Sequence, residues 1–453
     1  MLRHKGLTLA GVAFALVALA TPASGADKEK VLFRFNYANG MYPYGPVIFD
    51  QSGNLYGMTA FGSAYEGGNV YELSHTPEGH WKETVLYTFC PNWNCESGIL
   101  AYGGLVFDTA GNLYGVALGG GAYNSGVVFE LSPNLDGSWT ESVLHDFGGA
   151  GDGIAPECET LLLDSAGNLY GTTAIGGSGS CDLDGYPGCG TVFELSPGQG
   201  GIWNEKILYS FQNNGKDGNY PYAGLIADNS GNLYGTTSGG GLSSRHCFNR
   251  TCGVVFKLSP NADGNWTETI LHSFGGRDGE SPTAGLTIDA AGNLYGVTAL
   301  GGRYDCSPPY GCGTVFELTP DGNGSWTEKV LRAFYKGRYP RGAVILDPSG
   351  NIYGTTWVGG RHYDQMGTVF ELSPGTNGKW IQTILHNFGA ARDGQLPGGG
   401  LVFDSAGNLY GTTEAGGLPG DHKATCDLEP GCGTVFEVTR NAGKRTLTAA
   451  ARP

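Results

Sequence analysis

Hydrophobic and polar residues alternate with a period of two in short segments that are separated by turn residues. Val127, Phe129 and Leu131 alternate with Val128 and Glu130, as in a half-buried strand. The run 104–107 is apolar throughout, which is typical of a strand buried on both faces. No segment has a convincing helical period of 3.6. The pattern therefore predicts an all-β protein built from many short strands.

These strands belong to a unit that recurs along the chain. The string Gly-Asn-(Leu/Ile)-Tyr-Gly occurs seven times, 56 to 64 residues apart, with its tyrosine at Tyr56, Tyr114, Tyr170, Tyr234, Tyr295, Tyr353 and Tyr410. A strand resembling Gly-Thr-Val-Phe-Glu-Leu follows each copy, and a (Val/Ile)-Leu-x-x-Phe strand precedes or follows each unit. The second unit then reads as four strands, 104–107, 113–116, 127–131 and 143–147, with an Asp-to-Asn turn at 108–112. Seven four-stranded units of this size predict a β-propeller.

The two ends of the repeat region favour a closed ring over an open solenoid. A lone fourth-strand segment, 31–35, precedes the first unit, and the last unit stops after Val438 without a fourth strand. A solenoid would need capping units and would leave these ends unrelated. We therefore predict a seven-bladed propeller, a single domain over 27–438, in which the N-terminal strand (31–35) completes the last blade. The expected blades are 45–89, 103–147, 159–211, 223–274, 284–334, 342–388 and 398–438.

Residues 1–26 have the features of a signal peptide. Arg3 and Lys5 precede an apolar stretch from Leu7 to Ala20, and small residues at 24–26 suit a cleavage site. A retained N-terminal anchor is the alternative. No other apolar run approaches 18 residues, so we expect no membrane span after signal cleavage and a secreted protein, extracellular or periplasmic. Residues 439–453 are expected to form a flexible C-terminal tail.

Composition narrows the class of protein and of partner. Glycine accounts for 80 of 453 residues and charged residues for only 15%, which excludes a long helical protein, while 24 Tyr, 20 Phe and 8 Trp argue against disorder. The formal net charge of −16 disfavours nucleic acid and anionic lipid as partners. We expect a monomer.

Ten of the 11 cysteines lie in close pairs. A zinc site needs about four convergent ligands, whereas each pair stands alone in its loop, so disulfides are favoured over zinc. Cys158 has no partner in this scheme. The predicted disulfides are Cys90–Cys95, Cys181–Cys189, Cys247–Cys252, Cys306–Cys312 and Cys426–Cys432.

The repeated motifs carry a family resemblance. The series Asp-x-x-Gly-Asn-Leu-Tyr-Gly-Thr-Thr, Gly-Gly, Gly-Thr-Val-Phe-Glu-Leu-(Ser/Thr)-Pro and Trp-x-Glu-x-Val-Leu resembles the GloVer tandem repeat of exported bacterial proteins, over nearly all of 31–438. The resemblance implies a secreted or surface-displayed repeat protein and no established activity. Many members carry a C-terminal sorting signal, but 439–453 shows no apolar anchor.

A ligand site is expected where loops from several blades meet around the central axis, on one face of the ring. Residues there that depart from the repeat are the best candidates, because departures allow a symmetric scaffold to acquire a specific site. A carbohydrate or cell-surface ligand suits such a set, since tyrosine offers an apolar ring and a hydroxyl together. The alternative is that they fill turns and gaps between blades. The candidates are Tyr44, Tyr222, Arg303, Tyr304, Arg361, His362 and Tyr363.

No cofactor is expected, and the sequence leaves catalysis open. Asp182 and Asp184 resemble the start of a calcium loop but lack its closing Glu, so structural calcium is a weak candidate. No Gly-x-Ser-x-Gly elbow, His-Glu-x-x-His helix or phosphate-binding loop is present. The favoured function is an extracellular binding or interaction module. The alternative is a carbohydrate-active hydrolase or lyase with its active site at the axial pocket.

Overall fold

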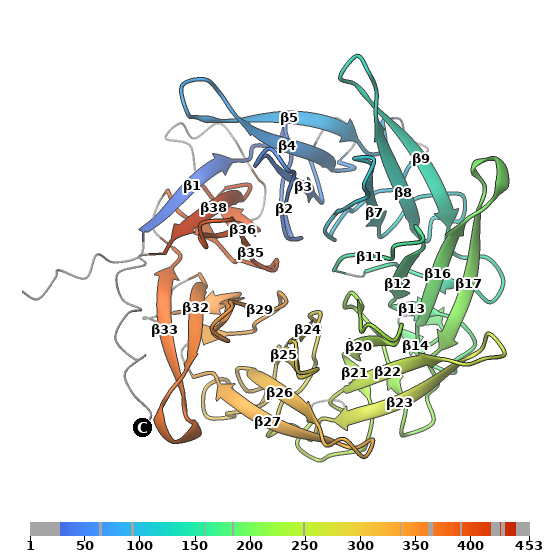
Figure 1. Ribbon diagram of the computed structural model, residues 1–453, viewed down its shortest axis with the longest axis vertical. Coiled ribbons are helices and arrows are strands. Elements are labelled where there is room, and N and C mark those ends of the chain that lie inside the picture. The colour runs from blue at the N-terminus through green and yellow to red at the C-terminus, as the bar shows by residue number, and fades with distance from the viewer. Residues whose placement is uncertain are drawn as a thin grey trace, which may run out of the picture.

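Seven four-stranded antiparallel sheets surround a central axis, and the protein is a seven-bladed β-propeller as predicted (Figure 1). The computed structural model describes residues 28–62, 66–91, 95–157, 159–183, 185–247, 250–335, 337–360, 366–389, 392–417, 426 and 431–440. Within these ranges the only helical segments are two single 3₁₀ turns, η1 (Gln199–Gly201) and η2 (Thr376–Gly378). None of the described helical segments has the length and apolarity to cross a bilayer.

Each blade runs from an inner strand beside the axis to an outer strand at the rim. The first three blades are β2 (Ile48–Phe49), β3 (Leu55–Thr59), β4 (Asn69–His75) and β5 (Trp81–Thr88); β6 (Val106–Phe107), β7 (Leu113–Ala117), β8 (Val127–Pro133) and β9 (Trp139–Asp146); and β11 (Leu162–Leu163), β12 (Leu169–Thr173), β16 (Thr191–Pro197) and β17 (Trp203–Ser210). The next three are β19 (Ile226–Ala227), β20 (Leu233–Thr237), β22 (Val254–Pro260) and β23 (Trp266–Ser273); β24 (Thr287–Ile288), β25 (Leu294–Thr298), β26 (Thr314–Pro320) and β27 (Trp326–Ala333); and β29 (Ile345–Leu346), β30 (Ile352–Thr356), β32 (Thr368–Pro374) and β33 (Trp380–Asn387).

The seventh blade joins the two ends of the described chain. It contains β35 (Val402–Phe403), β36 (Leu409–Thr413) and β38 (Thr434–Thr439), and β1 (Lys28–Arg34) is its outer strand. Strand β1 pairs antiparallel with β38, from Lys28 opposite Thr439 to Arg34 opposite Thr434. The predicted ring closure is therefore confirmed, with a strand that begins three residues earlier than expected.

The ordered ring also extends past the predicted boundary at 438. Strand β38 includes Thr439, and the Arg440 guanidinium donates hydrogen bonds to Asp347 Oδ2 at 3.1 Å and Tyr353 Oη at 2.6 Å, in the sixth blade. Residues 439 and 440 thus belong to the propeller rather than to a tail. The predicted signal peptide and residues 441–453 lie outside the described residues.

The hydrophobic core lies between neighbouring blades. At every junction a buried aromatic ring near the outer strand of one blade packs edge-on against a buried ring in the third strand of the next, at 5.0–5.2 Å between centroids. The junction that closes the ring uses Phe35 and Tyr71. The seven pairs are Phe89–Phe129, Phe147–Phe193, Phe211–Phe256, Phe274–Phe316, Phe334–Phe370, Phe388–Phe436 and Phe35–Tyr71.

The repeated Asp-x-x-Gly-Asn segments are hairpin turns. In the second blade, Asp108 Oδ1 accepts the N–H groups of Ala110 and Asn112 at 2.8 Å, and its Oδ2 accepts the Asn112 amide and the Tyr114 hydroxyl. The carboxylate is therefore used to join the first two strands of the blade. These aspartates are structural and are not candidates for catalysis.

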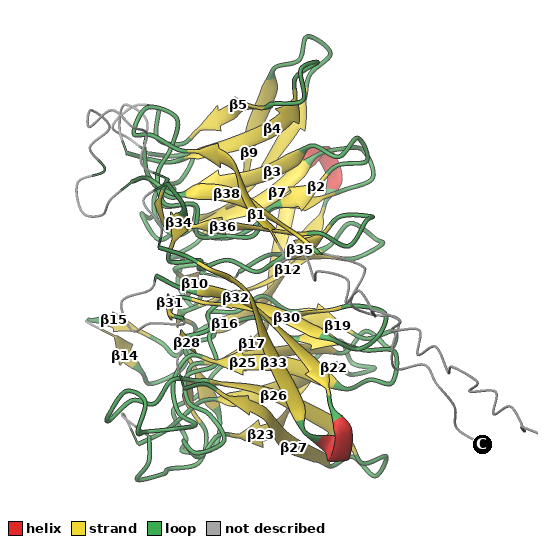
Figure 2. Cartoon of the chain, turned by 90° about the vertical axis from the view of Figure 1, so that its left-hand side faces the viewer, coloured by secondary structure: helices red, strands yellow, loops and turns green. Residues whose placement is uncertain are grey.

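The long loops gather on one face of the disc, at the left of Figure 2. They carry five short two-stranded ladders: β10 (Gly153–Ile154) with β13 (Ile175–Gly176), β14 (Asp182–Leu183) with β15 (Tyr186–Pro187), β18 (Gly218–Asn219) with β21 (Gly239–Gly240), β28 (Gly337–Arg338) with β31 (Val358–Gly359), and β34 (Gly394–Gln395) with β37 (Ala415–Gly416). All five predicted disulfides are present.

Candidate functional site

Each loop that enters an inner strand has a non-glycine residue in the left-handed backbone region at an equivalent position. These residues have φ between 55° and 62° and are Tyr42, Leu100, Ala155, Tyr220, Ser281, Tyr339 and Leu396. Few side chains adopt this conformation without support from their surroundings. For six of the seven the support comes from the preceding blade, where a loop carbonyl accepts the N–H group. The Ala155 N–H, for example, donates to the Ser125 carbonyl at 2.9 Å.

The disulfides stabilise this arrangement. In four loops the carbonyl that accepts this hydrogen bond belongs to the second cysteine of a disulfide: Cys189, Cys252, Cys312 and Cys432. A disulfide that closes so short a loop removes little entropy from the unfolded chain. Its main effect here is to fix a carbonyl that orients the next loop.

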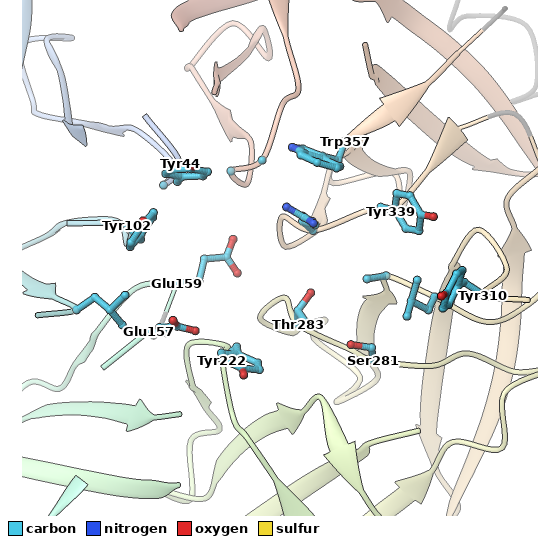
Figure 3. A pocket seen from close by; sticks show the side chains of 17 residues that line it. Tyr44, Tyr102, Glu157, Glu159, Tyr222, Ser281, Thr283, Tyr310, Tyr339 and Trp357 are labelled. Carbon is cyan, nitrogen blue, oxygen red and sulfur yellow. The ribbon is translucent and has the colours of Figure 1, made fainter. Parts of the chain in front are cut away.

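The second residue after each left-handed residue lines a pocket on the axis. We call these seven residues the axial ring: Tyr44, Tyr102, Glu157, Tyr222, Thr283, Arg341 and Gly398. They surround a cavity of about 690 Å³, the axial pocket. Figure 3 shows five of their side chains converging on it from separate blades: Tyr44, Tyr102, Glu157, Tyr222 and Thr283. The backbone repeats seven times, but the ring side chains differ in size, charge and polarity.

Aromatic groups form one part of the wall. The rings of Tyr44 and Tyr102 lie 4.8 Å apart between centroids and are tilted by 54°. On another side the guanidinium of Arg341 lies 4.0 Å from the centre of the Trp357 ring. The Trp357 Nε1 and the Thr283 Oγ1 are buried and have no hydrogen-bond partner among the described residues. Both residues line the pocket.

Glu157 is the ring residue whose pKa is moved to near neutral pH. Burial raises the pKa of its carboxyl to about 7, and no cation offsets the effect. Burial, together with the Glu157 charge, raises the pKa of Tyr222 to about 12. Burial also raises the pKa of Tyr44, which Arg341 lowers only in part. At neutral pH the pocket thus contains neutral tyrosines and a carboxyl that can gain or lose a proton.

Glu159 closes the middle of the ring. The positions equivalent to it in the other blades carry only Pro46, Gly104, Gly224, Gly285, Ala343 and Gly400. Its side chain extends across the axis, where Oε2 accepts the Gly285 N–H at 2.8 Å and Oε1 accepts the Ala343 N–H at 3.0 Å (Figure 3). Burial raises the pKa of this carboxyl, and the two N–H groups lower it only in part. One side chain thereby links the third blade to the fifth and sixth.

The structure brings two of the sequence candidates together and separates others. Tyr44 and Tyr222 line the axial pocket. Arg303 does not: it is exposed and pairs with Asp305 at 2.7 Å. Tyr304 donates its hydroxyl to the His246 carbonyl at 2.8 Å and so braces a neighbouring loop. Arg361, His362 and Tyr363 lie outside the described residues.

The weak calcium candidate also stays a prediction. Asp182 Oδ1 accepts the Gly185 N–H at 2.9 Å in a turn between β14 and β15, and Asp184 and Cys158 lie outside the described residues. Three other groups place carboxylate and imidazole atoms within 4.8 Å of one another, each at a blade junction: Glu29/His386/Asp393, His145/Asp152/Glu205 and His272/Asp278/Glu328. Their His–Asp hydrogen bonds of 2.9–3.1 Å account for the contacts.

Sequence reasoning did not select Tyr102, Glu157, Glu159, Arg341 or Trp357. In six of the seven loops the left-handed residue directly precedes a proline, which is visible in the sequence. The residue after that proline is the axial-ring position, and this signal would have found most of the missed residues. Aligning the seven loops on that position places the axial ring in one column. Trp357 lies in a different loop and has no such marker.

Comparisons with known proteins agree with the fold. The family model described as the Gloeobacter/Verrucomicrobia repeat matches residues 83–307 and 308–451. No curated protein matches the chain. Among solved structures, a polysaccharide lyase, ulvan lyase, bound to -[GlcA(1-4)Rha3S]- has a TM-score of 0.52 and 11% identity over 91% of this chain and 96% of that chain. A second ulvan lyase structure gives 0.53 and 10% over the same shares. A gluconolactonase from Xanthomonas campestris gives 0.39 and 15%, over 73% and 87%. At 10–11% identity the likeness to the two ulvan lyase structures concerns the fold alone.

Proposed function

Because the chain belongs to the Gloeobacter/Verrucomicrobia repeat family, whose description names no activity, we propose its function from the axial pocket. The protein is an exported binding module, and its axial pocket holds a carbohydrate, such as part of a cell-surface polymer. Five disulfides are consistent with an oxidising compartment outside the cytoplasm.

The observation that carries this proposal is the asymmetry of the axial ring. The strands, turns and junction aromatics repeat from blade to blade, and packing alone would favour equivalent residues at the ring as well. Instead the ring contains three tyrosines, a carboxyl, a hydroxyl, a guanidinium and a glycine, all facing one cavity of about 690 Å³. A cavity of this size with a few convergent polar groups is typical of ligand sites.

Several properties of the wall favour a sugar over other ligands. Tyr44 and Tyr102 offer apolar ring surface and hydroxyls together, which suits the two kinds of surface on a sugar. The unpartnered Trp357 Nε1 is a donor and Thr283 Oγ1 is both donor and acceptor, as sugar hydroxyls require. The net charge of −16 opposes nucleic acid. The ulvan lyases, which share the fold, act on a polysaccharide.

A glycan array followed by calorimetric titration tests the proposal. Wild-type protein is expected to bind a subset of glycans, and Tyr102→Ala is expected to weaken binding about tenfold or more, because an aromatic platform is lost. Tyr123→Ala is the matched control, since Tyr123 is 61% exposed and lies outside the pocket. Absence of binding to any glycan, or equal losses in both variants, would refute the proposal.

A second candidate function, a carbohydrate-active hydrolase or lyase, is favoured by one observation. The raised pKa of Glu157, about 7, matches the requirement for a general acid or base at neutral pH. Glycans that bind should then be incubated with the protein and assayed for new reducing ends and for unsaturated products. Turnover that Glu157→Gln abolishes, with binding retained, would establish the enzyme; binding without turnover supports the module.

A further inference from the structure

The rim of the propeller has a repeated polar arrangement at its blade junctions. At the junction of the second and third blades, His145 in the outer strand of one blade binds Asp152 in the following loop, and Glu205 in the next outer strand lies beside them. The junction of the fourth and fifth blades, formed by His272, Asp278 and Glu328, follows the same pattern. Where tyrosine replaces histidine, Tyr209 still donates to Asp217 at 2.9 Å. These junctions thus share acidic side chains and a partner that binds them.

The junction between the fifth and sixth blades departs from this pattern. Arg332 on β27 takes the place of the histidine, and Gln382 on β33 takes the place of the glutamate. A glutamate occupies that position in all six other blades: Glu29, Glu83, Glu141, Glu205, Glu268 and Glu328. This junction therefore has a guanidinium in place of an imidazole, and an amide in place of a carboxylate.

A cavity of about 550 Å³, which we call the rim pocket, lies at this junction. Arg332 and Gln382 line it, together with Tyr335 and Ile384, which are 42% and 38% exposed. The glycine backbones at 337 and 360 form another part of its wall. The cavity is large enough for a sugar-sized ligand. It has one cationic group, a hydrogen-bonding amide and apolar surface.

Arg332 has no counter-ion in the described part of the chain. Its Nε is buried and makes no hydrogen bond there, and its guanidinium forms no ion pair. Burial, and then the charge of the neighbouring Arg303, lower the pKa of Arg332. A half-buried guanidinium without an acidic partner is unusual in a chain of net charge −16, since desolvated charges are costly unless they are paired.

We propose that the rim pocket is a second binding site, which takes a carboxylate or sulfate ester carried by a sugar-sized ligand, with Arg332 as the anchor. The planar guanidinium matches both oxyanions in geometry, and Tyr335 and Ile384 supply apolar surface for the rest of the ligand. The Arg303 guanidinium, which is paired with Asp305, lies 4.7 Å from the centre of the Tyr335 ring. This site is separate from the axial pocket and does not depend on its function.

The test compares three small ligands by calorimetry or ligand-observed NMR, at an ionic strength held constant with sodium chloride. D-glucuronate carries a carboxylate, glucose 6-sulfate carries a sulfate ester, and D-glucose is the neutral control. Saturable binding of at least one acidic sugar, and much weaker binding of glucose, is expected. The preferred acid identifies the oxyanion that the site takes.

Two variants assign the binding to the rim pocket. Arg332→Gln is expected to raise the dissociation constant about tenfold or more, as for the loss of one charge-assisted hydrogen bond. Gln382→Glu restores the glutamate of the other junctions and gives Arg332 a partner, so it should weaken binding without removing the arginine. Arg277→Gln removes one exposed charge elsewhere and should leave binding unchanged. The axial variant Tyr102→Ala should also leave it unchanged.

Folding of each variant is checked by circular dichroism and thermal unfolding. Gln382→Glu is useful here because it introduces the side chain that six junctions already accommodate. If neither acidic sugar binds, if glucose binds as tightly, or if both rim variants retain wild-type affinity, the proposal is wrong. Loss of acidic-sugar binding in Tyr102→Ala alone would place that binding in the axial pocket and would also overturn it.

Discussion

Replacing Glu159 with alanine is expected to destabilise the whole propeller, although the residue lies in a pocket. The carboxylate accepts the Gly285 N–H at 2.8 Å and the Ala343 N–H at 3.0 Å, and no other side chain of the described residues replaces it at either donor. A buried donor left without a partner costs about 1–3 kcal/mol. Gly285 is buried and Ala343 is half-buried, so the second loss falls at the lower end of that range. Removal of the carboxylate also relieves its own desolvation cost, so the expected net decrease in the free energy of unfolding is about 1–3 kcal/mol.

Glu157 provides a matched control two residues away. Its carboxyl makes no hydrogen bond with the described residues, and burial raises its pKa to about 7. Glu157→Gln removes a charge that the folded state disfavours at pH 8, so its stability should equal or slightly exceed that of the wild type. Glu159→Gln retains one acceptor oxygen but directs its amide hydrogens toward a donor, so its loss should be intermediate.

Urea unfolding followed by tryptophan fluorescence, at pH 8 and with all variants oxidised, measures these differences. A Glu159→Ala loss below about 0.5 kcal/mol, the range of ordinary surface changes, would refute the cross-axis role of Glu159. Equal destabilisation by Glu157→Gln would refute the contrast between the two glutamates. Either result would mean that the hydrogen bonds across the axis do not stabilise the ring.

Three further predictions concern the rest of the fold. Phe35→Ala should lower the free energy of unfolding in urea by about 3–5 kcal/mol, because the Phe35 ring is 2% exposed and packs on Tyr71 where the ring of blades closes. A decrease no larger than that of a surface substitution would contradict closure by β1. The melting temperature should be higher at pH 5 than at pH 8, because burial raises the pKa of the junction glutamates, for example Glu205 to about 7 and Glu268 to about 8. Above about pH 4.5 these carboxyls stay protonated in the folded state and ionise in the unfolded state. The folded state therefore loses stability as the pH rises through 7 to 8. A melting temperature that is flat or rises over this range would be inconsistent with those shifts. Reduction of the disulfides should weaken glycan binding and leave the melting temperature nearly unchanged, because four of the disulfides fix carbonyls that orient the axial loops. A large fall in melting temperature with binding retained would assign the disulfides to global stability.

The fold was predictable because its signals are local and repeated. The seven Gly-Asn-(Leu/Ile)-Tyr-Gly strings gave the blade number, and the unpaired strand near Phe35 gave the closure. The cysteine pairs were predictable for the same reason, since each link spans only a few residues.

The pocket was harder to predict, because its residues come from loops of different blades and meet only in three dimensions. Tyr44 was identified as a departure from the repeat and Tyr222 by its place in the loops near the axis. The same reasoning also selected Arg303 and Tyr304, which lie elsewhere. Glu159 replaces small residues at its position, and only the structure shows that its carboxylate reaches backbone groups two and three blades away. The exchange of Glu for Gln382 is visible in the sequence, but the rim pocket beside it is not.

The central claim, that ligand is bound on the axis, is tested most directly by a crystal structure of the protein with the glycan that binds most tightly on the array. The account predicts sugar density in the axial pocket, in contact with Tyr44 and Tyr102 and within hydrogen-bond distance of Trp357 Nε1. Sugar density confined to the rim pocket or to the outer loops, with water alone in the axial pocket, would contradict it.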